Sequence, residues 1–294
     1  MPYLELTVEE RQAGRTVLSL LRGELGLSST LVKRLKRTDR GLLLNGAPVH
    51  TDARPRPGDR LTADLSAAER PAGVEPVELA LDILFEDEHL LLLNKSAPLA
   101  VIPSSLAPGE PTLAGGVVRY LGPGASFHPV NRLDRGTTGL MAVAKTGYMH
   151  DRLRRQLHGG GFQRTYLAVC VGRPDPPAGT VDLPIGRAPG SAVKRQVCPD
   201  GQAACTRYRT LCRNGDLTLV ALWPQTGRTH QIRVHMAAMG CPLAGDWLYG
   251  TEDRALIPRP ALHACRLTLR HPATGALLDF TAPLPADMKR LRPF

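Results

Sequence analysis

Hydrophobic and polar positions along the first 65 residues predict two helices followed by a small sheet. Apolar side chains recur at close to helical spacing between residues 16 and 27, which predicts the first helix. The second helix is predicted over residues 31–37, where the preceding Ser-Ser-Thr run offers a hydroxyl N-cap. Short apolar runs then flank Asn45-Gly46. This dipeptide favours a hairpin, because both turn positions must accept positive φ.

The second predicted helix separates apolar from basic side chains. Leu31, Val32 and Leu35 fall on one face. The basic residues lie largely on the other face and are Lys33, Arg34, Lys36 and Arg37. A charge run of this kind is usually a solvated face. Four cations with no acidic residue between them nevertheless favour a surface that binds RNA through its phosphates.

The remainder of the chain has the pattern of a larger domain. A basic amphipathic helix is predicted over residues 149–157, and an alternating, β-branched segment predicts a strand over residues 163–172. Residues 67–77 are rich in Ala, Glu and Pro with few large apolar side chains, which is typical of a linker. We therefore expect a small domain over residues 1–66 and a larger one over residues 78–294.

The most unusual polar segment places one carboxylate between two arginines. Arg132, Asp134 and Arg135 lie on a predicted loop that leads into a short apolar strand. Nearby positive charge favours an ionised carboxylate, and a positioned carboxylate can attack an electrophilic carbon. The alternative is a surface ion-pair cluster, which contributes little to stability.

Two later segments carry candidate binding residues. Tyr166 lies in the predicted strand, and taken alone it favours a half-buried residue that packs in the core. An apolar stripe that includes Ile232 predicts a helix, with Arg228, His230 and Arg233 near its start. Backbone N–H groups at a helix start favour anions, so this segment alone is typical of a phosphate-binding helix.

Composition narrows the classes of partner. The chain has 294 residues and a net charge of +10, which suits a polyanion such as nucleic acid. Its six cysteines form no Cys-x-x-Cys pair, so we expect no metal. No apolar run approaches the length of a membrane span, and the N-terminus lacks the features of a signal peptide. We therefore expect a cytoplasmic protein without a membrane partner, and a monomer as the default.

Three separated motifs together resemble the RluA-type (RluA/RluD) pseudouridine synthases. Residues 131–140 resemble their motif His-Arg-Leu-Asp-Arg-x-Thr-Ser-Gly-Leu, with Asn131 in the histidine place. Residues 164–172 are similar to Lys-x-Tyr-x-Ala-x-Val-x-Gly, and residues 227–235 match Gly-Arg-Thr-His-Gln-Ile-Arg-x-His without a break. Residues 13–65 resemble the small α-L RNA-binding domain that often precedes this catalytic domain.

The resemblance implies both a fold and a reaction. The fold is α+β, with a mixed, mostly antiparallel central sheet in the catalytic domain. The reaction isomerises a uridine in RNA to pseudouridine: the N1-glycosidic bond breaks, uracil rotates, and a C5-glycosidic bond forms. No redox change or phosphate transfer is involved, so no cofactor is expected. Ribosomal RNA is the first candidate substrate and transfer RNA the second.

The same resemblance implies roles for individual residues. Asp134 is the indispensable catalytic group, Arg233 pairs with it, and Ile232 packs beside the target base. Tyr166 stacks on that base, because a flipped base needs an aromatic platform. Arg132 either fills the space that the uridine vacates or contacts a phosphate. Arg228 and His230 complete the predicted substrate-binding set.

The residues leave several alternatives open. Asp134 either attacks the ribose C1′ or acts as a base that forms a glycal. A first rival function is a non-catalytic RNA-binding factor built on a decayed synthase, which the departures at Asn131, Ser96 and Ile102 would fit. A second is a glycosidase or nucleosidase, but this chemistry requires a second carboxylate, and no motif supplies one.

Overall fold

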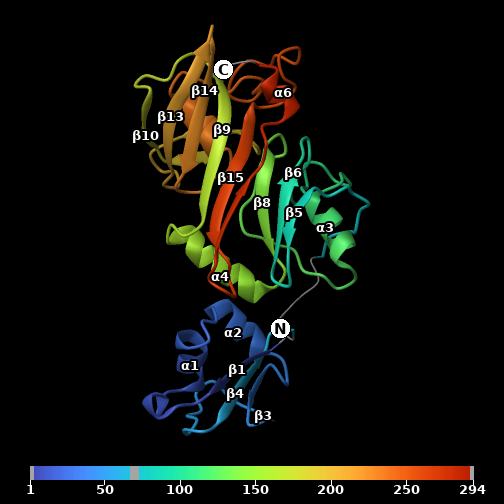
Figure 1. Ribbon diagram of the computed structural model, residues 1–294, viewed down its shortest axis with the longest axis vertical. Helices are drawn as coiled ribbons and strands as arrows, with labels where there is room; N and C mark the ends of the chain where they lie inside the picture. The colour runs from blue at the N-terminus through green and yellow to red at the C-terminus, as the bar shows by residue number, and fades with distance from the viewer. Residues whose placement is uncertain (1–2, 67–72, 292–294) are drawn as a thin grey trace.

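The computed structural model describes residues 3–66 and 73–291 and contains a small and a large sheet with helices between them (Figure 1). Residues 67–72 of the predicted linker lie outside the described residues. The described part of that linker ends against helix α3 (Leu113–Leu121), where the Val77 N–H donates to the Gly115 carbonyl at 3.2 Å. In the parts of the chain that the structure describes, no helix is long and apolar enough to span a membrane.

The small sheet is antiparallel and has the order β1-β4-β2-β3. Its strands are β1 (Tyr3–Thr7), β2 (Leu42–Leu44), β3 (Ala47–Pro48) and β4 (Arg60–Asp64). Asn45 and Gly46 form the turn between β2 and β3 with φ of 52° and 83°. The hairpin predicted from this dipeptide is therefore confirmed.

Two short helices accompany this sheet, α1 (Val17–Gly23) and α2 (Ser29–Leu35), after the 3-10 turn Glu10–Gln12. The side chains of Thr16 and Ser28 cap them by accepting from backbone N–H groups. Helix α1 ends earlier than the predicted residue 27, because Gly26 adopts a φ of 66° and turns the chain. Most apolar side chains of both helices are buried in one core with the sheet, whereas Leu18 of α1 is exposed.

The large sheet has the path β10-β13-β14-β9-β15-β8-β6-β5, with β16 beside β15 and β7 beside β8 (Figure 1). All of these pairs are antiparallel except β8 with β15. The predicted α+β fold with a mixed, mostly antiparallel sheet is thus confirmed. The strands are β5 (Ile83–Glu86), β6 (Leu90–Lys95), β7 (His128–Pro129), β8 (Thr138–Ala144), β9 (Gln163–Val171), β10 (Ala178–Asp182), β13 (Cys205–Asn214), β14 (Leu217–Pro224), β15 (Leu262–Arg270) and β16 (Leu277–Thr281).

A small hairpin and three helices complete this part of the chain. The hairpin consists of β11 (Ile185–Arg187) and β12 (Arg195–Val197). The helices are α4 (Gly147–His158), α5 (Gln231–Ala238) and α6 (Ala286–Lys289). The predicted basic helix and alternating strand are confirmed as α4 and β9, with bounds shifted by one or two residues at their ends.

The parallel pairing of β8 with β15 fixes the loop that precedes β8. Gly139 pairs with Ala264 at a φ of 111°, and an added Cβ would lie 2.3 Å from the Ala264 carbonyl oxygen. Only glycine fits this close approach. Strand β8 is buried along its whole length, so the loop that carries Asp134 is attached directly to the core.

Helix α4 lies between the large sheet and residues 3–66, the described part of the expected N-terminal domain (Figure 1). Tyr148 and Met149 belong to the same buried cluster as the apolar residues of α1 and α2. The Tyr148 hydroxyl donates to the Leu25 carbonyl at 3.0 Å, and Arg155 Nη2 donates to the Gly26 carbonyl at 2.7 Å. The N-terminal domain is therefore docked on α4 by apolar contacts and by hydrogen bonds.

Candidate active site

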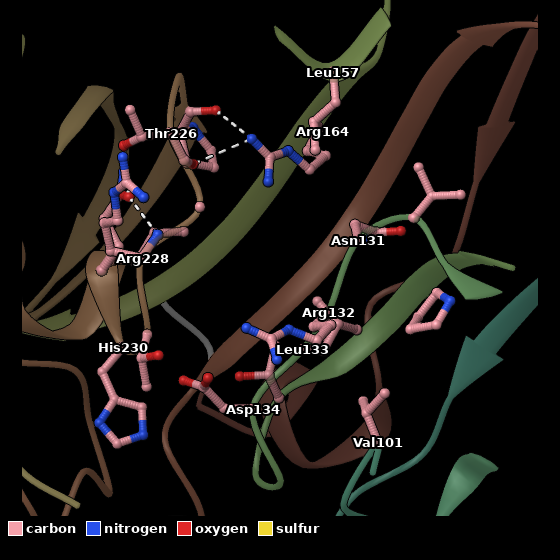
Figure 2. A pocket seen from close by; sticks show the side chains of 18 of the residues that line it. Val101, Asn131, Arg132, Leu133, Asp134, Leu157, Arg164, Thr226, Arg228 and His230 are labelled. Carbon is pink, nitrogen blue, oxygen red and sulfur yellow. Dashed lines mark hydrogen bonds between the residues drawn. The ribbon is translucent and has the colours of Figure 1, made fainter. Parts of the chain in front are cut away.

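A cleft of about 750 Å³ is bounded by the loop before β8, by one face of α4 and by the segment that leads into α5. Figure 2 shows Asp134 and His230 at one end of the cleft, and Leu157 and Arg164 toward the other. The cleft brings together the predicted residues Arg132, Asp134, Tyr166, Arg228, His230, Ile232 and Arg233. The three sequence motifs therefore meet at one site.

Asp134 lies on a tight turn, in which its carbonyl accepts from the Thr137 N–H at 3.0 Å. Its side chain is 26% exposed, and Oδ2 lies 3.6 Å from Arg233 Nη1. Arg259 braces the same turn from below, because its Nη1 donates to the Gly136 carbonyl at 3.1 Å. The carboxylate is thus held next to a cation and faces a cleft that solvent can enter.

Arg233 is held mainly by a residue that sequence reasoning left without a role. Its Nε and Nη2 donate to the two carboxylate oxygens of Asp246, both at 2.7 Å. Asp246 is fully buried and also accepts from the backbone of Leu248 and Tyr249. Burial acts to lower the pKa of Arg233, but Asp246 and Asp134 together raise it. This grip leaves Nη1 directed at Asp134.

Arg233 therefore lies next to Asp134 as expected, but its hydrogen bonds go to Asp246. The Arg233 guanidinium also lies 5.0 Å from the centre of the Tyr249 ring. The sequence did contain Gly245-Asp246 and Tyr249-Gly250 after the third motif. Their role could not be read, because Asp246 and Arg233 are 13 positions apart and meet only through the fold.

Tyr166 and Ile232 form an apolar surface in the cleft. Tyr166 is 5% exposed and Ile232 is 6% exposed, and both belong to the core cluster beneath the cleft. Burial raises the pKa of Tyr166. Tyr166 is more deeply buried than the half-buried strand residue that its pattern alone favoured, yet it lines the cleft.

Arg228 and His230 lie on the segment before α5, where Gln231 holds the backbone. The Gln231 side chain accepts from the Arg228 N–H at 3.0 Å and donates to the Cys205 carbonyl at 3.0 Å. His230 adopts a φ of 58°, and its Nδ1 lies 2.8 Å from the Tyr249 hydroxyl. Burial lowers the pKa of His230, which favours a neutral ring.

Arg132 differs from these pinned groups. It is exposed and lines the cleft, and it makes no ion pair with any residue in the described ranges. Figure 2 shows its side chain next to that of Asp134 on the same loop. Its guanidinium can therefore change position when a ligand enters.

Asn131, which stands where the family motif has histidine, has a structural role. Asn131 is buried; its Nδ2 donates to the Leu140 carbonyl at 3.2 Å, and its Oδ1 accepts from the Ala142 N–H at 2.9 Å. These bonds tie the loop to β8. Ile102 is 42% exposed and lines the cleft, while Ser96 supplies its carbonyl to the buried Lys95.

Lys95 is a second residue that the sequence did not single out. It is 2% exposed, and its Nζ donates to the carbonyls of Ser96 and Leu99 at 2.8 Å and of Arg135 at 3.4 Å. Burial lowers its pKa to about 7, opposed by the charge of Asp134. Lys95 thus joins the loop after β6 to the loop that carries Asp134.

The remaining predicted residues lie outside the cleft. Lys33 and Arg34 are on α2, and Lys36 and Arg37 follow its last residue. Lys33, Lys36 and Arg37 are exposed, and Arg34 is half-buried. The predicted site residues therefore form two groups, one in the cleft and one on the N-terminal domain. Within the described ranges no cluster of His, Cys, Asp or Glu could hold a metal ion.

Comparison with known proteins agrees with this geometry. Residues 89–238 match the family model described as RNA pseudouridylate synthase, and this range contains all three motifs. The chain therefore belongs to the RNA pseudouridylate synthase family, and the enzyme class predicted from the sequence is confirmed. Enzymes of this class are isomerases that act on RNA.

Individual relatives cover nearly the whole chain. An uncharacterized RNA pseudouridine synthase of Bacillus subtilis, YjbO, is 43% identical over 92% of this chain and 95% of its own. Ribosomal large subunit pseudouridine synthase D of Escherichia coli is 38% identical over 86% of this chain and 82% of its own. Among solved structures, human RNA pseudouridylate synthase domain containing 1 is 28% identical, with a TM-score of 0.58 over 71% of this chain and 86% of that one.

Proposed function

We propose that this synthase isomerises specific uridines of large-subunit ribosomal RNA, with transfer RNA as the second candidate, and that Asp134 is its catalytic residue. The observation that carries the proposal is the row Asp134, Arg233 and Asp246 beside the apolar surface of Tyr166 and Ile232. The ribosomal substrate is supported by the relatives named as ribosomal large subunit enzymes.

The proposed reaction begins with a uridine flipped into the cleft. Unstacking costs a few kcal/mol, which stacking of the base on Tyr166 partly returns. Arg132 fills the vacated position in the RNA or contacts a phosphate; its freedom from ion pairs suits either role. Arg228 and His230 contact the nucleotide from the opposite side of the cleft.

Asp134 then acts at the ribose. In one route its carboxylate attacks C1′ as the C1′–N1 bond breaks, and in the other it removes a ribose proton to give a glycal. In both routes the freed uracil rotates and C5 bonds to C1′. In the first route the bond between Asp134 and C1′ breaks as C5 attacks; in the second, C5 adds to the glycal and the ribose regains the proton from Asp134. The proton on C5 then leaves, and N1 ends protonated. Arg233 favours the charged carboxylate and fixes its direction, since Asp246 prevents the guanidinium from turning away.

Two rival functions fit the cleft less well. A glycosidase requires two available carboxylates, and Asp134 is the only carboxylate among the described residues that line the cleft. A decayed, non-catalytic RNA-binding factor has no need for a buried Asp246 that orients Arg233. The departure at Asn131, which suggested decay, is instead explained by its bonds to β8.

The proposal includes the wider organisation of the protein. We propose domains over residues 1–66 and 78–294 with a linker over 67–77, RNA contacts by Lys33, Arg34, Lys36 and Arg37, and a cytoplasmic monomer. Asp134, Arg132, Tyr166, Ile232, Arg233, Arg228 and His230 form the proposed site.

The test compares pseudouridine maps of ribosomal and transfer RNA from cells with and without the gene. We expect one or a few sites to vanish without the gene, to return with the wild-type protein and to stay absent with Asp134→Ala. The purified Asp134→Ala protein should bind RNA with nearly wild-type affinity, because the substitution removes only the reacting group. Wild-type turnover in this variant would refute the assignment.

A further inference from the structure

Helix α4 has three faces with different surroundings. Tyr148 and Arg155 face the N-terminal domain and donate to its backbone. Met149 and Leu153 are buried in the core. The third face lines the cleft and consists of His150, Arg154, Leu157 and His158. These four residues recur at intervals of four, three and one, as one side of a helix requires.

The cleft face of α4 is positively charged, and none of the α4 residues that line the cleft is acidic; Asp151, three positions before Arg154, does not line it. Arg154 is exposed and makes no ion pair or hydrogen bond with any described residue. Arg132 and Arg164 line the same cleft, and Asp134 is the only acidic side chain among its described lining residues. Burial and the neighbouring His128 lower the pKa of His150, so the arginines carry the charge at neutral pH.

Some of the cleft-lining side chains lie far from the Asp134 carboxylate. Figure 2 places Asp134 and His230 at one end of the cleft, and Leu157 and Arg164 away from them. Tyr166, Ile232 and Arg233 already furnish the surroundings of one nucleotide near Asp134. The α4 end therefore offers cations to a part of the ligand that extends beyond the nucleotide at the Asp134 end.

We propose that the α4 end of the cleft binds the backbone phosphates of the RNA strand that flanks the target uridine, with Arg154 as the principal cation. The identity of the ligand as RNA rests on the proposed function. A flipped nucleotide is covalently continuous with its neighbours, so their phosphates must leave the cleft past one of its walls. The α4 wall supplies unpaired cations there, and phosphate neutralisation by Arg and Lys is a main source of RNA affinity.

A flexible strand suits this wall better than a single small anion. The Nη2 atom of Arg164 is committed to the carbonyls of Pro224 and Thr226, while Arg154 and Arg132 are free to follow a moving backbone. Leu157 of α4 adds an apolar side chain to the lining of the cleft. The opposite face of α4 holds the domain that carries the α2 cations, so one helix adjoins both surfaces that we assign to RNA.

The experiment measures binding by fluorescence anisotropy with a labelled oligouridine of about 16 nucleotides, across a series of salt concentrations. The Asp134→Ala protein is the background, so that the RNA stays unmodified. Adding Arg154→Ala should weaken binding about fivefold and lower the slope of log affinity against log salt by about 0.7, the value for one lost phosphate contact on a single strand.

The matched control is Arg209→Ala in the same background. Arg209 is an exposed arginine on β13 that does not line the cleft, and its removal changes the net charge equally. Wild-type affinity and slope after Arg154→Ala would overturn the proposal, as would an equal loss after Arg209→Ala. Inorganic phosphate that competes as well, per phosphate, as unlabelled oligouridine would also overturn it, because it would indicate a simple anion site.

This assay is independent of catalysis. Unchanged pseudouridine maps in cells that lack the gene would refute the proposed function, while the anisotropy measurement would still report whether Arg154 binds an RNA strand.

Discussion

The arginines at the two ends of the cleft differ in whether other side chains hold them in place. At the Asp134 end, Arg233 is clamped by Asp246, and its free nitrogen is aimed at one carboxylate. At the α4 end, Arg154 has no partner among the described residues. A clamped charge is preorganised, so it does not reorient during reaction. A free charge adapts to a mobile polymer. The difference supports our proposal that the Asp134 end carries out the chemistry and the α4 end binds the RNA strand.

The largest effect should follow from loosening the clamp. Asp246→Asn keeps the shape of the side chain but removes the charge that Arg233 requires, so the guanidinium can turn away from Asp134. We expect turnover at saturating RNA to fall about 10- to 100-fold, as for other residues that orient a reacting group, with little change in RNA affinity.

The matched control for the clamp is Asp279→Asn. Asp279 of β16 also receives two hydrogen bonds from one arginine, Arg266 of the paired strand β15, but both side chains are exposed. Single-turnover rates of the two variants should separate, while their RNA affinities should stay similar. Equal losses of turnover would show that any Arg–Asp pair matters only through folding.

A second effect concerns the buried amine of Lys95, which donates to a carbonyl of the loop that carries Asp134. The pKa of Lys95 is about 7 in the folded protein, against 10.5 for an unperturbed lysine, so between these pH values the unfolded state binds the additional proton. Lys95 therefore makes the free energy of unfolding rise with pH from about 7 to about 10, by about 1.4 kcal/mol per pH unit. Below pH 7 both states are protonated and this slope disappears.

Lys95→Met should remove that contribution. Urea unfolding at several pH values measures it as the difference between the wild-type and variant slopes, which cancels groups common to both proteins. Parallel slopes would mean that Lys95 keeps its proton in the folded state, and that its three carbonyl partners outweigh burial.

The exposed cations on and after α2, which lie outside the cleft, should respond more weakly, and only through binding. Lys33→Ala combined with Lys36→Ala removes two exposed cations. We expect RNA affinity to fall about tenfold and the salt slope by about 1.4, while turnover at saturating RNA stays at the wild-type value. A filter-binding titration with ribosomal RNA measures the affinity. A drop in turnover at saturation would contradict the division between the two regions.

The smallest effect lies at the joint between the domains. Tyr148→Phe keeps the ring in the core but removes the hydroxyl, which donates to the Leu25 carbonyl and accepts from Arg152 Nη1. Arg152 is exposed, so water can replace its bond and the loss is mainly that of the bond to Leu25. We expect about 1 kcal/mol less stability, the usual net value of one such bond, measured by urea unfolding. A much larger loss would indicate that this single bond holds the domain in place.

The sequence predicted the parts of the site that lie in continuous motifs, and missed those that depend on distant contacts. Asp134 and Arg233 could be found because their neighbours in the chain form recognisable patterns. Asp246 and Lys95 could not, since their importance comes from partners that only the fold brings near. Asn131 was read as a departure, although its amide makes two hydrogen bonds to β8.

The prediction of helices and strands was limited in a similar way. The Asn45-Gly46 hairpin and helix α4 followed from local pattern, because periodicity and turn chemistry act over a few residues. The sheet type was implied by the family resemblance instead. The early end of α1 did not, because the helical pattern continues through Leu25 to Leu27, while the Gly26 turn ends the helix.

The three faces of α4 have a consequence for how this helix can change over evolutionary time. Each added or deleted residue rotates everything downstream by about 100°. A single-residue insertion between Tyr148 and Arg154 would therefore turn Arg154 out of the cleft and move Arg155 off the Gly26 carbonyl at the same time. Side chains on each face can be exchanged independently, but the number of residues in the helix cannot change without disturbing all three faces.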